Sequence, residues 1–120
     1  MASYSYVDVD NLAGEGPGSM VRKTRRALGV RAFGFNYFVF PPDTTGHEHD
    51  HADEGMEEVM FVVRGSGTLR VDDEEVELKP GRFVRLDPEA TRVPVSGSDG
   101  LEFVTFGAPL EGKYEPPSWG

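Results

Sequence analysis

The sequence has no cysteine among its 120 residues, which excludes disulfide bonds, thiolate metal sites and cysteine nucleophiles. It has no apolar run near the ~18 residues of a membrane span, and its first residues lack the apolar core of a signal peptide. Positive charge is scarce as well, with 12 Lys and Arg against 21 Asp and Glu, for a formal net charge of −9. Such a charge argues against nucleic acids and anionic membranes as partners. These features predict a cytoplasmic protein without a membrane partner.

Long helices are also excluded, because 15 glycines and 9 prolines interrupt the chain too often. The apolar residues fall in short alternating runs bounded by turn residues, which is typical of β-strands. The chain is therefore predicted to be all-β, a sandwich or barrel in one domain. The expected strands cover residues 4–9, 33–40, 58–64, 68–71, 76–78, 82–86 and 101–106. The segment 72–73 is predicted to be a hairpin turn, 65–67 another turn, and the basic segment 22–26 an exposed or interface strand.

The three histidines of the chain stand at alternate positions, His47, His49 and His51. Alternate side chains of an extended strand share a face, and their Cα atoms lie ~6.6 Å apart, so two neighbouring rings can bind one ion. The outer two are expected ~13 Å apart, too far for one metal to take all three comfortably. Glu57 or Glu58 can add an oxygen ligand, and such a set suits iron, manganese, nickel or zinc. The alternative interpretation is a solvated loop, because acidic residues are interleaved with the histidines.

The residues around these histidines form an ordered pattern. A Pro-Pro-Asp turn at 41–43 precedes an H-x-H pair at His49 and His51, and Glu58 and Gly65 follow. This order resembles the first motif of the cupin family, with His47 as an extra histidine and a small insertion after His51. The resemblance implies a double-stranded β-helix, a jelly-roll barrel with its site inside, and a homodimer. It places the barrel core at about residues 33–107, an N-terminal arm at 1–32 and an extended tail at 108–120.

Residues 78–88 carry a Leu-Lys-Pro-Gly turn followed by a valine and a proline, and are similar to the second cupin motif. The same resemblance puts Arg92 at the place of the family's last metal-binding histidine. A guanidinium that faces inward repels a metal but can hold a carboxylate or phosphate through paired hydrogen bonds. One that faces outward is an ordinary surface arginine, and the usual exposure of charged residues favours this second orientation.

The barrel implied by the resemblance also suggests which side chains face its interior. Strand alternation puts His49, His51, Glu58 and Met60 on the inner side. The aromatic strand contributes either Phe35 and Tyr37 or Asn36 and Phe38, and one sequence does not decide the register. The candidate metal ligands are therefore His49, His51 and Glu58, with His47 as a further candidate. The candidate ligand-binding residues are Arg92, Tyr37, Asn36 and Met60.

Three functions remain open from the sequence. The first is a barrel that binds a divalent transition metal and a small organic ligand, such as a dioxygenase or an isomerase. The second is a metal-free binding or sensor barrel in which Arg92 anchors an anion. The third is a structural or interaction module with a vestigial pocket.

Overall fold

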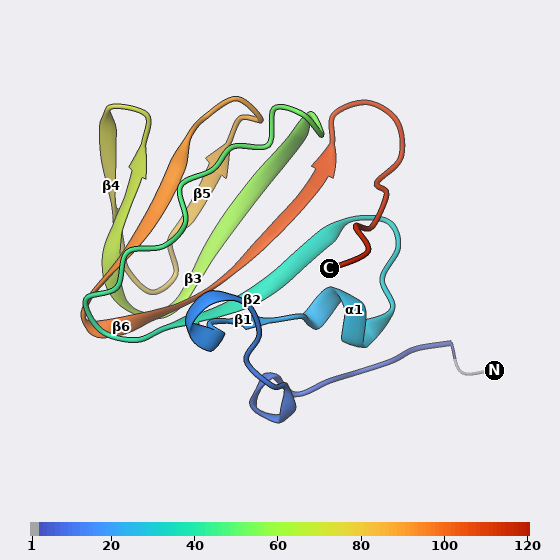
Figure 1. The fold of residues 1–120 in the computed structure, drawn as a ribbon, viewed down its shortest axis with the longest axis horizontal. Coiled ribbons are helices and arrows are strands. Elements are labelled where there is room, and N and C mark those ends of the chain that lie inside the picture. The colour runs from blue at the N-terminus through green and yellow to red at the C-terminus, as the bar shows by residue number, and fades with distance from the viewer. Residues whose placement is uncertain (1–2) are drawn as a thin grey trace.

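The structure is a computed structural model that describes residues 3–120, and its regular secondary structure is mainly antiparallel β-sheet (Figure 1). This confirms the all-β prediction. The strands are β1 (Val21–Arg22), β2 (Gly34–Phe40), β3 (Met56–Val71), β4 (Glu74–Leu78), β5 (Phe83–Leu86) and β6 (Arg92–Pro109). The helical elements are α1 (Thr24–Leu28) and two 3-10 turns, Val9–Asn11 and Pro17–Ser19. No helix within residues 3–120 is long and apolar enough to cross a membrane.

Two long strands, β3 and β6, bend and divide the sheet into two halves. The N-terminal part of β3 pairs with the C-terminal part of β6, and β1, β2 and β5 complete this large half-sheet. Beyond the bend, residues 67–71 of β3 pair with residues 92–96 of β6 and with β4, which forms the small half-sheet. The bend replaces the turn predicted at 65–67. The hairpin predicted at 72–73 is confirmed, because Val71 pairs with Glu74 across it.

The bend depends on glycines because β3 and β6 approach closely there. A Cβ atom on Gly65 would lie 2.2 Å from the carbonyl oxygen of Gly100, and one on Gly67 would lie 2.2 Å from that of Val95. Gly65 also has a φ of 89°, which other residues rarely adopt. Glycine therefore allows one strand to belong to both half-sheets.

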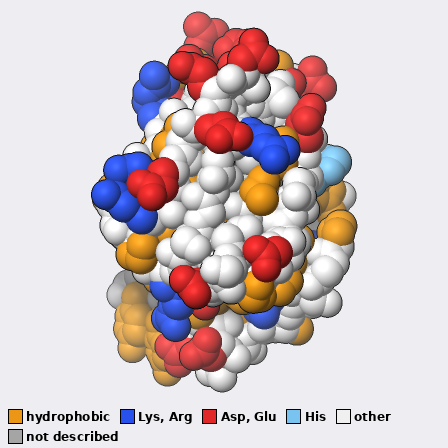
Figure 2. Space-filling view, turned by 90° about the vertical axis from the view of Figure 1, so that its left-hand side faces the viewer, with side chains coloured by type: hydrophobic (Ala, Val, Ile, Leu, Met, Phe, Trp, Pro, Cys, Tyr) orange, Lys and Arg blue, Asp and Glu red, His pale blue; other side chains and the backbone are white. Residues whose placement is uncertain are grey.

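The apolar core lies between the two half-sheets. Leu69 and Leu78 come from the small half-sheet, and they belong to one buried cluster with residues of the large half-sheet. The other buried members of that cluster are Phe40, Met60, Val62, Leu86, Leu101 and Phe103. Most charged side chains lie at the surface, with Glu58 and Arg92 as buried exceptions. The face seen from the β4 side carries acidic side chains near its top, where the β3–β4 turn lies (Figure 2).

The N-terminal region differs from the expectation. Residues 4–9 form no strand, since Tyr4 and Tyr6 are strongly exposed and the segment pairs with no sheet edge. The basic segment 22–26 is also not a strand, because only Arg22 belongs to the short strand β1 and the chain then turns into α1. Alternating residue types favour a strand, but a strand also needs a neighbouring strand to pair with, and these segments lack a long one.

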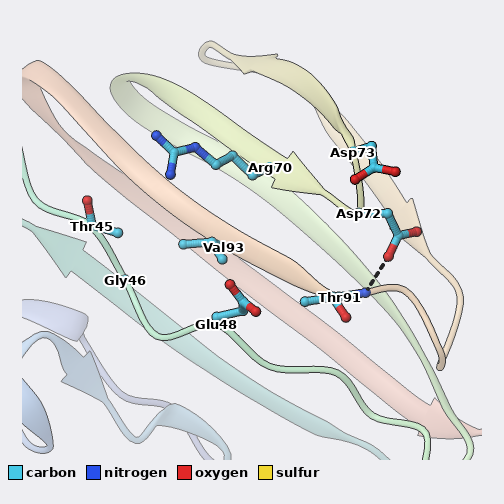
Figure 3. A pocket seen from close by; sticks show the side chains of 8 residues that line it. All are labelled: Thr45, Gly46, Glu48, Arg70, Asp72, Asp73, Thr91 and Val93. Atoms are coloured by element: carbon cyan, nitrogen blue, oxygen red, sulfur yellow. Dashed lines mark hydrogen bonds between the residues drawn. The ribbon is translucent and has the colours of Figure 1, made fainter.

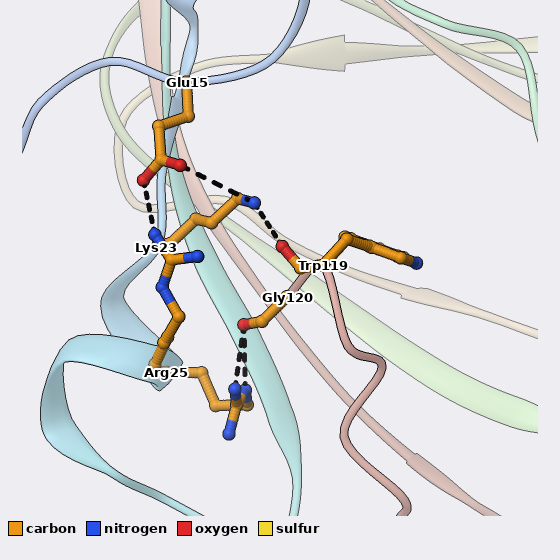
Figure 4. A network of polar contacts seen from close by, with 6 residues as sticks. Glu15, Lys23, Arg25, Trp119 and Gly120 are labelled. Atoms are coloured by element: carbon orange, nitrogen blue, oxygen red, sulfur yellow. Dashed lines mark hydrogen bonds and ion pairs between the residues drawn. The ribbon is translucent and has the colours of Figure 1, made fainter.

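The C-terminal segment folds back beside the N-terminal arm (Figure 1). Arg25 donates hydrogen bonds to the oxygen of Gly120 from Nη2 (2.9 Å) and Nε (3.2 Å), and Lys23 donates to the oxygen of Trp119 (Figure 4). Glu15 pairs with Lys23 at 3.7 Å and thereby joins the same network. These contacts give the basic segment a structural role, since Lys23 and Arg25 hold the last two residues against it.

Candidate metal centre

The histidine segment is extended and lies along the beginning of β6. Thr45 bridges Val95, and His49 and Arg92 exchange both backbone hydrogen bonds at 3.2 and 2.9 Å. The backbone N–H of His51 then donates to the carbonyl of Pro88 at 2.9 Å. In Figure 1 this green segment runs across the front of the sheet and reaches the start of β3. The histidines are therefore fixed to the small half-sheet rather than carried on a free loop.

Three of the predicted ligands meet in the structure. His49, His51 and Glu58 each offer one ligand atom, and these atoms all lie within 4.8 Å of one another. Glu58 comes from β3 on the large half-sheet and is buried, while the two histidines are half-buried. Two imidazole nitrogens and one carboxylate oxygen form a donor set that suits divalent transition metals. The residues present thus fit a metal ion, and the site joins both halves of the sheet.

One hydrogen bond determines which nitrogen of His49 is available. Its Nδ1 lies 3.0 Å from the backbone oxygen of His47, so Nδ1 carries the proton and donates it. The neutral ring then keeps its lone pair on Nε2. This arrangement is the usual way in which proteins orient a metal-binding imidazole.

His51 and Glu58 face each other directly, with 3.3 Å between Nε2 and a carboxylate oxygen. The hydrogen bond to Glu58 raises the pKa of His51, although partial burial and the charge of Arg92 act in the opposite direction. In the absence of metal this contact favours the protonated imidazole, held by the carboxylate of Glu58. A metal ion bound there replaces that proton.

The structure also distinguishes the two adjacent glutamates. Glu57 lies on the other face of β3, where its carboxylate is 3.4 Å from Arg85. The turn at 52–55 accounts for the extra residues after His51, and in it the side chain of Asp50 accepts a hydrogen bond from the N–H of Ala52. The insertion therefore returns the chain to β3 with Glu58 facing the histidines.

The remaining predicted site residues are dispersed. His47 is exposed, and its ring stacks on that of His49 with 5.9 Å between centroids rather than joining the three ligands. Met60 is buried next to Glu58 on the inner face of β3, and it belongs to the apolar core. Asn36 pairs with Thr105, which in turn pairs with Met60, and the side-chain oxygen of Asn36 is buried without a partner in the described chain.

Tyr37 lies on the opposite face of β2 from Asn36. Its hydroxyl donates a hydrogen bond to Glu102 at 2.8 Å, and burial together with this bond raises the pKa of Tyr37 to about 12. Phe38 stacks on Phe103 in the core. Of the two registers left open by the sequence, the structure therefore has Asn36 and Phe38 inside.

Arg92 is buried, with only 1% of its surface exposed, so the expectation that favoured a surface position is wrong. The physical reason is its place in the sheet, since it pairs with Val71 on one side and with His49 on the other. Its Nη2 donates to the backbone oxygen of Asp87 at 3.0 Å. Within residues 3–120, no atom accepts a hydrogen bond from its Nε or Nη1.

Sequence reasoning missed the parts of the site that come from loops. The backbone oxygen of Asp87 supports Arg92, and nothing in the residue type signals a role for a carbonyl group. A carboxylate oxygen of Glu54 lies 3.6 Å from Nδ1 of His51. The spacing of three residues between His51 and Glu54 was the only signal available for that contact.

A separate hollow of about 500 Å³ opens on the outer face of the small half-sheet (Figure 3). Arg70 and Val93 face one another there, and the side chain of Asp72 accepts a hydrogen bond from the N–H of Thr91 at 3.0 Å. Thr45, Gly46, Glu48 and Asp73 complete the lining. None of the three predicted metal ligands lines this hollow, so it is distinct from the candidate metal centre.

Taken together, the bent antiparallel sheet and its inner histidine and glutamate side chains define a double-stranded β-helix with a donor set suited to a metal. The family model described as Cupin domain matches residues 36–104, more than half of the chain. The chain therefore belongs to the cupin family, as the two sequence motifs suggested.

Solved cupin structures share this fold. A cupin protein from Bacteroides fragilis is 21% identical, with a TM-score of 0.77 over 99% of this chain and 94% of that chain. A predicted oxalate decarboxylase from Thermotoga maritima is 19% identical, with a TM-score of 0.72 over 88% of this chain and all (100%) of that chain. A protein from Thermus thermophilus is 22% identical, with a TM-score of 0.68 over 87% and 96% of the two chains. No curated protein matches the sequence. At these identities the likeness concerns the fold alone.

Proposed function

We propose that this cupin binds a divalent transition metal through His49, His51 and Glu58 and presents it to a small organic ligand. The observation that carries the proposal is the convergence of the three ligand atoms within 4.8 Å. The fixed tautomer of His49 supports it, because the hydrogen bond to His47 keeps Nε2 free to coordinate. The acidic partner of His51 supports it as well, since a carboxylate and an imidazole at 3.3 Å can exchange a shared proton for a metal ion.

The ligand atoms limit which metals can bind and which reactions the site can support. Two histidines and one carboxylate with open positions suit iron(II), and manganese, nickel and zinc accept the same donors. When bound, such a metal supplies a Lewis acid with open coordination positions for a ligand. A dioxygenase or an isomerase acting on a small organic molecule fits this arrangement, and Asn36 and Met60 lie on the same inner face of the sheet as Glu58.

The proposal is tested by metal analysis of the protein purified without chelators, followed by calorimetric titration of the metal-free protein with Mn²⁺, Ni²⁺ and Zn²⁺. We expect about one ion per chain, and we expect the double variant His49→Ala, His51→Ala to lose it while keeping a β-rich circular dichroism spectrum. The control is His47→Ala, which removes the stacked exposed ring but keeps the backbone oxygen that holds His49. Unchanged metal stoichiometry in the double variant contradicts the proposal.

A metal-free binding barrel is the second candidate function. The buried guanidinium of Arg92 favours it, because two of its nitrogens lack an acceptor within the described residues. This candidate is distinguished by binding of a small anion to metal-free protein with an affinity that added metal does not change.

We further propose that the chain forms a homodimer through the outer face of the large half-sheet. Aromatic rings gather there, with Phe35 and Phe106 at 6.0 Å and Phe61 and Phe83 at 4.4 Å between centroids. Phe83 is 69% exposed, and contiguous exposed aromatic side chains commonly mark protein contacts. The charged pair Glu57 and Arg85 lies on the same face and can provide a polar rim.

A further inference from the structure

The side chain of Arg92 belongs to the same inner surface as the metal ligands. Arg92 and His49 exchange both backbone hydrogen bonds, at 3.2 and 2.9 Å. Residues opposed in this way on antiparallel strands carry their side chains on one face, with Cβ atoms ~5 Å apart. The neighbouring residues Thr91 and Val93 line the hollow on the outer face, which agrees with an inward direction for Arg92.

The hydrogen bonding of Arg92 is incomplete. Its guanidinium is 1% exposed and has one acceptor, the backbone oxygen of Asp87, for Nη2. Nε and Nη1 are buried and find no acceptor in residues 3–120. A buried donor without an acceptor is costly, and a buried cation without a counter-charge is more so. The group that best satisfies a guanidinium is a carboxylate or a phosphate, which accepts charge-assisted hydrogen bonds.

The charges of the site specify the ligand further. The buried charged residues of the site are Glu58, with one negative charge, and Arg92, with one positive charge, while the carboxylate of Glu54 at the edge of the site is exposed to solvent. His49 and His51 are neutral when they bind a metal. The buried protein part of a metal-loaded site therefore has no net charge, and a divalent ion leaves two positive charges in a half-buried or buried setting. One carboxylate offsets half of this charge, and a molecule with two carboxylates offsets all of it.

We propose that the ligand of this barrel is a small dicarboxylate, with one carboxylate on the Nε and Nη1 donors of Arg92 and the other on the metal held by His49, His51 and Glu58. This inference rests on the proposed metal site. It gives Arg92 a role as ligand-binding residue at a position where a further metal ligand would otherwise stand. Metal and dicarboxylate then strengthen each other's binding, and by linkage the factor is the same in both directions.

The test uses Co²⁺ as the metal and malonate as the dicarboxylate. Co²⁺ binding is measured by calorimetry and by its visible absorption, with and without malonate, and the binding of malonate to free Co²⁺ is measured separately and subtracted. We expect malonate and Co²⁺ to raise each other's affinity by the same factor. Acetate, with one charge, should bind more weakly than malonate, and the uncharged malonamide should not bind.

The variant Arg92→Gln should lower the affinity for malonate roughly 10- to 100-fold, the effect of losing hydrogen bonds to a charged group. Its affinity for Co²⁺ alone should be equal or higher, because a positive charge beside the ion is removed. Arg70→Gln is the matched control, since it removes the same charge one rung away on the opposite face, and it should change neither affinity. Arg92→Lys keeps the charge but loses the planar donor geometry, so its malonate affinity should be intermediate.

The outcomes separate this inference from the proposed function. Absence of Co²⁺ binding contradicts the metal site itself. Co²⁺ binding combined with equal malonate affinity in the wild-type and Arg92→Gln proteins contradicts only the role of Arg92. If the Arg92 variants do not fold, wild-type protein still decides the matter, because equal binding of malonamide and malonate contradicts an anion site. Malonate binding that is independent of Co²⁺ contradicts the shared ligand and supports a metal-free barrel.

Discussion

The pairing of His51 with Glu58 couples the protonation of the metal-free site to folding. The hydrogen bond that His51 donates to the carboxylate of Glu58 raises the pKa of His51 above its ordinary value of about 6.5. A raised folded-state pKa means that the native state binds the proton more tightly than the unfolded chain. The stabilising contribution is therefore complete below pH ~6.5 and is lost as the pH rises through the raised pKa.

This coupling gives a first prediction. The free energy of unfolding of the metal-free protein, measured by chemical denaturation, should fall between about pH 6.5 and the raised pKa of His51. Glu58→Gln removes the charge that favours the imidazolium and should flatten this dependence. The control Glu57→Gln changes the adjacent carboxylate on the outer face and should keep the slope. Identical pH profiles for the two variants would contradict the assignment of the slope to the His51–Glu58 pair.

Arg92 provides a second prediction at the residue scale. Arg92→His replaces a fixed positive charge beside His49 with a neutral imidazole that can donate an electron pair. We expect tighter metal binding than in the wild type and the loss of any enhancement by malonate. Calorimetric titration with Ni²⁺ in the presence and absence of malonate measures both effects. Unchanged values for both would show that the side chain of Arg92 does not act on the metal.

At the scale of elements, the bend in β3 is a feature that should not tolerate substitution of its glycine. Gly65 combines a φ of 89° with a clash at 2.2 Å between an added Cβ and the backbone of Gly100. Gly81 has nearly the same φ, 88°, but an added Cβ there meets no atom within 4 Å. Substituting Gly81 therefore measures the cost of backbone strain alone, and substituting Gly65 measures that cost together with the cost of forcing two strands apart.

Gly81→Ala should lower the free energy of unfolding by about 1–3 kcal/mol, the cost of a strained backbone. Gly65→Ala should cost at least ~2 kcal/mol more, because β3 and β6 must also move apart. Urea denaturation with circular dichroism measures both variants. Equal losses would mean that the strands can separate at the bend without disturbing the core.

Local sequence patterns predicted a strand with a continuous aromatic run and a turn between two strands that are neighbours in the sequence. The aromatic run became β2, and the Asp72-Asp73 turn joined β3 to β4 as expected. They did not predict the bend at 65–67, since a glycine pair signals a turn as well as a bulge. The segment 4–9 alternates like a strand but lacks a partner, and whether a partner exists depends on the tertiary fold.

The site shows the same division. The alternate spacing of the histidines identified His49 and His51 as candidate ligands. The choice between Glu57 and Glu58 depended on the conformation of the turn at 52–55, which residue spacing alone does not determine. The exposure of Arg92 was misjudged because base rates for charged residues ignore the strand on either side. Arg92 is buried because it lies between two neighbouring segments, which pair with it through Val71 and His49.

At the scale of the whole molecule, the outer aromatic face predicts association. A stable interface buries upward of ~1,000 Å². We expect light scattering coupled to size-exclusion chromatography to give a dimer at micromolar concentration, and Phe83→Glu to shift it toward monomer. Tyr6→Ser probes the N-terminal segment as the other candidate interface and should leave the dimer intact. A wild-type monomer under these conditions contradicts the proposal, and dissociation by Tyr6→Ser alone would place the contact at the N-terminal arm.

The position of the three candidate metal ligands on both half-sheets bears on the lifetime of the protein. Glu58 belongs to β3 on the large half-sheet, and His49 is held on the small half-sheet by Arg92. An ion bound by Glu58 and His49 would cross-link the two half-sheets, which otherwise contact each other through apolar packing. At a free metal concentration of about 100 times Kd, such binding adds ~2.7 kcal/mol to the free energy of unfolding, which raises Tm by roughly 10 °C. Because proteases attack the transiently opened chain, its resistance to digestion should rise and fall with the supply of metal.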